Sequence, residues 1–224
     1  MIRLLSLTLL LAAASAGGQS GERRFNLDRF DAVELASSDA VRVVPGDAYS
    51  VTASGDPRAV AALAITVRGD TLHVDRTPGS HRDRGATVTV AMPALRAAML
   101  SGSGSIRASG IAGPAFTGRL GGSGSMVLTG MKVGRASFAL GGSGSIVAEG
   151  AADAVAIDLG RSGRIDTGKL ATPGVAIDMG GSGAITATAS DTAMIRAGGS
   201  GIVRVAGGAR CDVRNGGSAI VRCG

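Results

Sequence analysis

The second half of the chain alternates apolar and polar residues in short runs, and each run leads into a Gly-Ser-Gly turn or a close variant of it. The serines at the centres of these turns follow one another at intervals of 18 to 20 residues. These marker serines are Ser103, Ser123, Ser143, Ser162, Ser182, Ser200 and Ser218. Alternation with a period of two predicts β-strands on either side of each turn, and the regular interval predicts a stack of similar units.

Alignment on the marker serines indicates which side chains point inward. The positions five and three residues before the serine, and three residues after it, are apolar in almost every repeat. The position three before is occupied by Leu100, Leu120, Leu140, Leu159, Met179, Ala197 and Asn215. We therefore expect an all-β fold, a single-stranded parallel β-helix with 18–20 residues per coil, whose coils lie about 4.8 Å apart.

The positions between these apolar ones are expected to point outward. Four residues before the marker serine they are Met99, Arg119, Ala139, Asp158, Asp178, Arg196 and Arg214. Four residues after it they are Arg107, Val127, Val147, Asp166, Thr186, Arg204 and Arg222. Because equivalent positions of stacked coils are neighbours, each set is expected to form one outward column.

Residues 25–100 lack the marker but are expected to form a β-rich N-terminal segment continuous with the repeats of residues 101–224. Strands are expected at residues 32–35, 41–44, 49–52, 71–74 and 86–90, one or two helical turns at 57–63, and a charged loop at 79–85. Such a segment is suited to cover the first coil, because an open solenoid end exposes unpaired strand edges.

The beginning of the chain has the parts of a secretory signal peptide. Arg3 precedes an apolar run over residues 4–14, and an Ala-Ser-Ala cleavage site ends at Ala16. The apolar run is too short to span a bilayer. We expect residues 1–16 to be removed and residues 17–24 to form a short polar lead. The mature chain is then exported, to the periplasm or the cell surface, without a transmembrane span.

Composition narrows the possible core and partners. Glycine accounts for 37 of 224 residues and aromatic residues for only 2%, so this glycine-rich chain must build its core from aliphatic side chains. The net charge of +6 suggests an anionic partner, but nucleic acid is not expected, because proteins that bind single strands stack bases on aromatic rings. Anionic polysaccharide, lipid head groups and other envelope components are the expected partners, and self-association stays open.

The repeated Gly-Ser-Gly-x-(Ile/Val) unit and the opening Phe30-Asp31-Ala32-Val33 resemble the head GIN domain family of putative autotransporter adhesins. The resemblance extends over about residues 24–223 and implies that the β-helix is right-handed and that the function is adhesion. The residue after Gly-Ser-Gly is commonly Asp or Asn in that family. Here it is Ser105, Ser125, Ser145, Arg164, Ala184, Ile202 or Ile220. Neither a cation in the corners nor any other cofactor is therefore expected.

The marker serines resemble the nucleophile of a hydrolase in being flanked by glycine, but the chemistry argues against catalysis. A nucleophilic serine stands on a strand-to-helix turn and needs a histidine and an acid. No helix is expected after any marker, and both histidines precede them all. We interpret the serines as stacked corners, with glycines that permit unusual φ values and hydroxyls that bond to the backbone or to the next serine.

Two groups of outward residues are candidates for a functional site. Asp158 and Asp178 stand in consecutive repeats of one column, and Arg196 follows in the next. This arrangement suits Ca²⁺ binding, acid–base chemistry on a polysaccharide, or simply a solvated ladder of mixed charge. The second group is a candidate anion-binding cluster near the C-terminus, because stacked arginines repel one another unless water or an anion lies between them. It consists of Arg196, Arg204, Arg210, Arg214 and Arg222.

The cysteines and histidines give two further expectations. Cys211 and Cys223 fall on inward positions at strand ends remote from the marker turn, so we predict a disulfide that closes the last coil. His73 and His81 have no second ligand at metal-binding spacing, and no metal site is expected.

The sequence therefore favours an exported, non-enzymatic β-solenoid that acts as an adhesin or as an envelope-interaction module. Two alternatives stay open. One is a polysaccharide-active lyase or hydrolase that uses the face of Asp158, Asp178 and Arg196. The other is a purely structural envelope protein.

Overall fold

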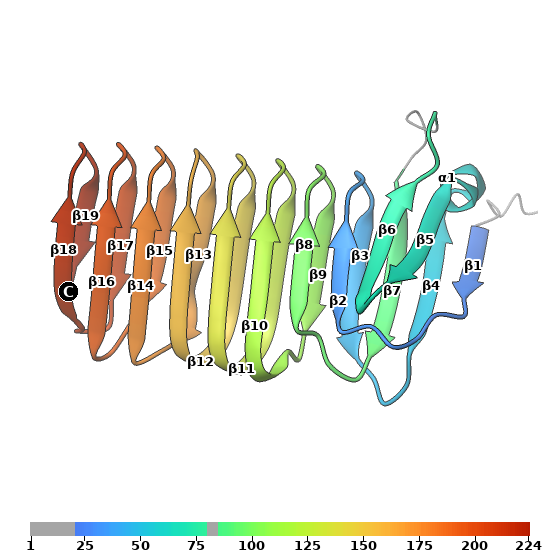
Figure 1. Ribbon diagram of the computed structural model, residues 1–224, viewed down its shortest axis with the longest axis horizontal. Coiled ribbons are helices and arrows are strands. Elements are labelled where there is room, and N and C mark those ends of the chain that lie inside the picture. Colours follow the sequence, from blue (N-terminus) through green and yellow to red (C-terminus); the bar gives the residue numbers. More distant parts are fainter. Residues whose placement is uncertain (1–20, 80–84) are drawn as a thin grey trace, which may run out of the picture.

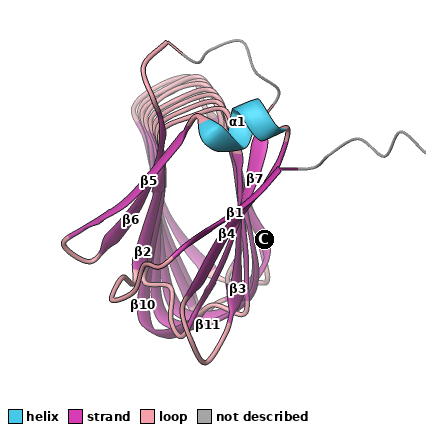
Figure 2. Cartoon of the chain, turned by 90° about the vertical axis from the view of Figure 1, so that its right-hand side faces the viewer, coloured by secondary structure: helices cyan, strands magenta, loops and turns pink. Residues whose placement is uncertain are grey.

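A computed structural model describes residues 21–79 and 85–224, which form an elongated solenoid (Figure 1). The expected signal peptide and most of the charged loop, including His81, lie outside the described residues. About six turns separate the first marker turn from the last. Seen along the rod, two walls of strands face each other and are joined by tight corners (Figure 2).

One wall, called wall A, contains the strands that precede the marker turns. Its strands pair in parallel, and β11 and β12 contribute their second halves. In stacking order they are β2 (Ala32–Leu35), β8 (Ala97–Leu100), β10 (Ala112–Leu120), β11 (Ser125–Leu140), β12 (Ser145–Leu159), β14 (Gly174–Met179), β16 (Thr192–Ala197) and β18 (Arg210–Asn215). The register is that of the alignment on the serines, since Asp158 pairs with Asp178.

The opposite wall, wall B, contains the strands that follow the marker turns. The first halves of β11 and β12 belong to it, so each of these two strands passes around the second corner into wall A. The other strands are β3 (Ala40–Pro45), β9 (Ser105–Ser109), β13 (Arg164–Ala171), β15 (Ala184–Thr188), β17 (Ile202–Ala206) and β19 (Ile220–Cys223). The predicted parallel β-helix is thereby confirmed.

The core lies between the walls and is aliphatic, as expected. In the column three residues before the marker, the side chains from Leu100 to Ala197 are all buried. The few aromatic rings are accommodated by small residues: Gly118 leaves room for Phe138, whose ring centroid lies 6.4 Å from that of Phe116. Only the last rung departs from the pattern. Val213 stands in register with Ile195 but is 42% exposed, because no further coil covers it.

The N-terminal segment covers the first coil with one strand on each wall that pairs with it in parallel, and adds antiparallel strands beyond these two. On wall A, β6 (Thr71–Arg76) pairs with β2, and β5 (Leu63–Arg68) pairs with β6. On wall B, β7 (Ala86–Met92) pairs with β3, followed by β4 (Ser50–Gly55) and β1 (Gly21–Phe25). A short helix, α1 (Pro57–Ala61), lies at the same end, and the Asp56 side chain accepts hydrogen bonds from its first amides.

The expected strands and the short helix of this segment are confirmed, but two of its strands were missed. β1 occupies residues that we expected to form a polar lead, and β5 follows α1 directly. β1 has no alternating apolar pattern: its central residues are charged and exposed, and pairing with β4 holds it in place.

Residues 32–45 turn out to form the two walls of a further coil, from which the chain departs into β4 instead of turning a second corner. β2 and β3 are connected by Ser37, Ser38 and Asp39, which occupy the place of a marker turn. An added Cβ at Gly104 would overlap the carbonyl oxygen of Asp39, and one at Gly102 that of Ser37. The sequence pattern missed this coil because its corner contains no glycine.

At the other end, Cys211 and Cys223 form a disulfide between β18 and β19, with Cα atoms 6.5 Å apart. The predicted pairing is therefore confirmed. It links the two walls at the last rung, where the walls converge closely enough for the bond.

Candidate functional site

The marker corners are stacked so closely that their glycines have no room for a side chain. A Cβ at Gly122 would overlap the carbonyl oxygen of Gly102, and one at Gly142 would overlap that of Gly122. None of the marker glycines has a φ in the left-handed region, so our interpretation that they permit unusual φ values is wrong. That conformation occurs at the second corner, at Gly110 and Gly130. Glycine is needed at the marker because backbones approach each other there.

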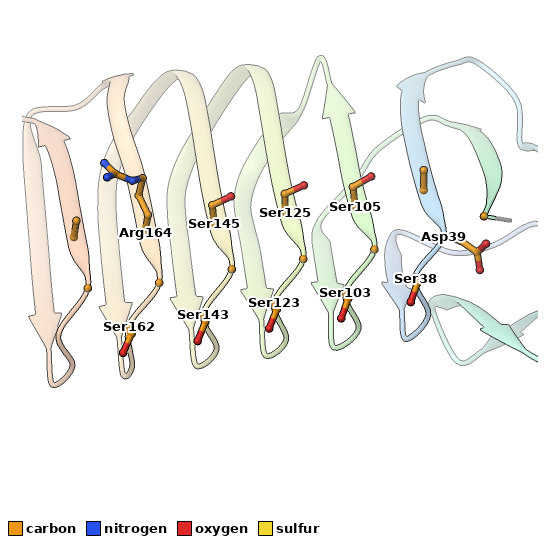
Figure 3. A pocket seen from close by; sticks show the side chains of 18 of the residues that line it. Ser38, Asp39, Ser103, Ser105, Ser123, Ser125, Ser143, Ser145, Ser162 and Arg164 are labelled. Carbon is orange, nitrogen blue, oxygen red and sulfur yellow. The ribbon is translucent and has the colours of Figure 1, made fainter. Parts of the chain in front are cut away.

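The marker serines Ser103, Ser123, Ser143 and Ser162 point away from the core along the edge of the solenoid (Figure 3). Except for Ser218, the marker serines line a groove of about 1080 Å³ together with a second column that includes Ser105, Ser125, Ser145 and Arg164. The marker hydroxyls make no hydrogen bond within residues 21–79 and 85–224, contrary to our interpretation. The groove is thus lined largely by hydroxyl groups and backbone, with the Arg164 guanidinium on one rung and the Asp39 carboxylate at its N-terminal end, and no described histidine is among its lining residues. His73, the one described histidine, lies on β6 with its Nδ1 3.1 Å from Glu34.

A buried ion pair closes the N-terminal end of this groove. The carboxylate of Asp39 is fully buried and accepts two hydrogen bonds from Arg76, of 2.8 and 2.6 Å, one of 2.6 Å from Ser37 and one of 2.7 Å from the Ala86 amide. Burial alone would raise the pKa of Asp39, but these hydrogen bonds and the charge of Arg76 outweigh it and lower that pKa below 3.8. The pair fixes the first coil against β6 and β7.

The acidic candidates lie where the alignment placed them, on the outer face of wall A. Asp158 pairs in register with Asp178, Asp178 with Arg196, and Arg196 with Arg214. All four are exposed. They border a shallow hollow of about 320 Å³, which also includes Met194. Within the described chain, none of these charged groups takes part in an ion pair.

The five arginines of the expected anion-binding cluster are divided between the walls. Arg196 and Arg214 are neighbours on wall A, whereas Arg204 and Arg222 are neighbours on wall B. Arg210 pairs in register with Thr192 on wall A. The structure thus brings the arginines together in pairs, and the pairs point outward from opposite walls.

A further arginine pair escaped the sequence alignment. Arg42 of β3 stands in register with Arg107 of β9, in the same outward column of wall B that contains Arg204 and Arg222. The residues between the two pairs in this column are Val127, Val147, Asp166 and Thr186. Recognising β2 and β3 as a coil would have revealed this pair. Wall B therefore has one arginine pair near each end of the same column.

No group of residues in the described ranges could hold a metal ion by clustered His, Cys, Asp or Glu side chains. Nor does any helix in those ranges have the length and apolarity to cross a membrane. The structural candidates are thus three surfaces: the serine groove, the charged column of wall A and the arginine column of wall B.

The same sequence matches a family model, that of the putative auto-transporter adhesins with a head GIN domain, over residues 29–209. The chain belongs to this family. The match includes the coil of β2 and β3 and ends just before β18. No curated protein matches the chain.

Solved structures from Bacteroides and Parabacteroides species have the same fold. A putative adhesin of Bacteroides fragilis aligns with a TM-score of 0.81 and 16% identity, covering 92% of this chain and 97% of that one. A putative lipid binding protein of Parabacteroides distasonis has a TM-score of 0.71 and 17% identity, with 93% and 98% covered. A putative adhesin of Parabacteroides merdae has a TM-score of 0.68 and 17% identity, with 93% and 97% covered. At these identities the likeness concerns the fold.

Proposed function

We propose that this head GIN domain protein is an exported, non-enzymatic solenoid that binds anionic components of the cell envelope or of another surface, with wall B as its binding face. The observation that carries the proposal is the outward column with arginine pairs at both ends. Arg107 and Arg204 are five rungs apart, which is about 24 Å at about 4.8 Å per rung. A ligand that contacts both pairs must be extended or be itself a surface.

The chemistry of the column favours an anion. Stacked guanidinium groups at this spacing repel each other, and a phosphate, sulfate or carboxylate bound between them removes the repulsion and accepts their hydrogen bonds. Neither Arg204 nor Arg222 forms an ion pair within the part of the chain that the structure describes. The one acidic residue between the two pairs, Asp166, accepts a hydrogen bond from the Gly168 amide at 3.0 Å.

The family and the neighbouring folds support this class of function. A family of putative adhesins implies binding at a surface, and the P. distasonis neighbour, a putative lipid binding protein, makes phosphorylated lipid head groups a reasonable ligand beside acidic polysaccharides. Export by the signal peptide of residues 1–16 would bring the chain to such partners.

Retention on heparin resin tests the proposal. We expect Arg204→Ser/Arg222→Ser to elute at distinctly lower salt than the wild type, and the matched pair Arg196→Ser/Arg214→Ser to elute close to it, since Asp178 and Asp212 lie beside that pair on wall A. Both variants lose two positive charges, so a general charge effect would shift them equally. Equal shifts, or none, would exclude wall B as the binding face.

A polysaccharide-active enzyme is the second candidate, and the hollow beside Asp158 and Asp178 is the observation in its favour. Incubation with polyuronates, with and without Ca²⁺, separates the two functions. Turnover that Asp158→Ala abolishes would support the enzyme and contradict our proposal. We expect no turnover.

A further inference from the structure

The charged column of wall A has an order that is complementary to itself. From β12 to β18 it reads Asp158, Asp178, Arg196 and Arg214, two carboxylates followed by two guanidinium groups. Although Asp178 and Arg196 are direct neighbours in the ladder, no ion pair joins them in the described structure. The four charges remain available to groups outside the chain.

In the adjacent outward column, the side chains change from small to large at the same strand at which the charged column changes from aspartate to arginine. Two residues before the charged positions, β12 and β14 carry Ala156 and Ala176, whereas β16 carries Met194, which is 58% exposed, and β18 carries the exposed Asp212. One column further, Gly174 of β14 is followed by Thr192 of β16. Ala156, Ala176 and Met194 all line the hollow of about 320 Å³.

We propose that wall A is the interface of a symmetric dimer with a second copy of this chain. Consider a two-fold axis parallel to the strands that runs in the interface between β14 and β16. It turns the second rod around, so that β14 faces the partner's β16 and β12 faces the partner's β18. Because the axis is parallel to the strands, each residue keeps its position along the strand direction. Each outward column therefore faces the same column of the partner.

This operation pairs opposite charges at every rung of the charged column. Asp178 faces the partner's Arg196, and Asp158 faces the partner's Arg214. Since the interface is two-fold symmetric, each contact occurs twice. The same operation places Met194 over the partner's Ala176, so that the protruding side chain enters the hollow of the other copy. Charge and shape thus agree on one arrangement.

The overlap is small, which determines the strength of the dimer. It includes four rungs of about 4.8 Å and strands of six residues at about 3.3 Å each, roughly 19 Å by 20 Å, or about 400 Å² of each copy. A standard stable interface buries about 800 Å² per partner. We therefore expect a reversible dimer with a Kd of about 10⁻⁵ to 10⁻³ M. Because wall B lies opposite wall A in each copy, the dimer would present its two binding faces on opposite sides, where they can engage two separate anionic surfaces or chains.

Sedimentation equilibrium of the purified protein over about 10 µM to 1 mM tests the dimer through charge exchange. Asp178→Arg places arginine opposite arginine at both symmetric contacts, and Arg196→Asp places carboxylate opposite carboxylate, so each is expected to raise the Kd at least tenfold. The double variant Asp178→Arg/Arg196→Asp restores opposite charges across the axis and is expected to return the Kd to within about threefold of the wild type. Arg204→Asp on wall B is the matched control and should leave the Kd unchanged.

Several results would overturn the proposal. They are a wild type that stays monomeric at 1 mM, single variants that dimerise like the wild type, a double variant that does not recover, and assembly beyond the dimer, which would indicate contacts between rod ends. Thermal melting of each variant establishes that it is folded. If a charge variant does not fold, Met194→Glu replaces it and should weaken the dimer likewise. Heparin retention reports on wall B and is measured separately, so the two proposals can fail independently.

Discussion

Gly142→Ala probes the packing of the marker corners. The new methyl group would lie far inside the 3.0 Å below which real Cβ contacts are essentially absent, against the carbonyl oxygen of Gly122. That atom belongs to the backbone and cannot rotate away, so the two corners must separate by about 1 Å. Two hydrogen bonds flank the contact, from the Gly141 amide to Leu120 at 2.9 Å and from the Ser145 amide to Gly124 at 3.1 Å. Both are stretched by such a displacement.

The cost follows from these terms. Each weakened hydrogen bond contributes about 1 kcal/mol, and overpacking adds about 1–3 kcal/mol, which gives a total of about 2–4 kcal/mol. The chain itself shows that a corner can accommodate a side chain, because Arg161 takes the place of the first glycine one corner later. At that corner a Cβ at Gly163 would lie 2.6 Å from the Gly144 carbonyl oxygen, which is farther than at the equivalent glycines of the other corners. Corners can therefore widen at a finite cost.

Thermal unfolding followed by circular dichroism measures the effect. For a chain of this size about 1 kcal/mol shifts Tm by about 2–4 °C, so Gly142→Ala should lower Tm by about 5–15 °C. Gly141→Ala is the control, because nothing lies within 4 Å of its Cβ position and its φ is not in the left-handed region. It should change Tm by less than about 2 °C. If both variants melt together, close approach is not the reason for glycine in the marker.

Two further predictions concern the ends of the rod. Cys211→Ser/Cys223→Ser opens a loop of 12 residues, which should cost about 3 kcal/mol; hydrogen exchange should speed up in β18 and β19, and unchanged protection there would contradict a capping role. Asp39→Asn should destabilise the protein at pH 7. Because the pKa of Asp39 is lowered on folding from 3.8, its contribution is complete above that pH and is lost as the pH falls through the folded pKa. Urea titrations at pH 7 and pH 3 should therefore show the wild type and the variant converging at the lower pH; a constant difference would mean that the ionised carboxylate is not the stabilising group.

Much of the fold follows from the sequence because the repeat length varies only between 18 and 20 residues. In a stacked coil each residue meets the equivalent residue of the next coil, so the columns of an alignment are also columns in space. This is why the neighbours of Asp178 and the inward positions of Cys211 and Cys223 were predictable. The alternation of Val88 and Val90 likewise sufficed to place β7.

The rest depends on information that periodicity does not contain. The corner of Ser37, Ser38 and Asp39 has no marker glycine, because on its outer side β2 and β3 pair with β6 and β7 instead of with another coil. Arg76 of β6 compensates the buried carboxylate of Asp39. Our explanation of the marker glycines was wrong because a sequence repeat shows only where glycine recurs. It does not show whether a left-handed φ or the closeness of a neighbouring backbone requires glycine there. The alignment placed Arg196 with Arg214 in one column and Arg204 with Arg222 in another, but we treated both columns as one cluster at the end of the rod, whereas the marker turn between Arg196 and Arg204 puts the two columns on opposite walls.

The central claim is that wall B is the face that binds anions, and chemical-shift perturbation on the labelled protein tests it most directly. On titration with a heparin oligosaccharide, the backbone amides of Arg204, Arg222, Arg42 and Arg107 and their outward neighbours on wall B should shift together. The amides around Asp158 and Asp178 on wall A should not move. Shifts centred on wall A, or no shifts at concentrations where heparin resin retains the protein, would contradict the account.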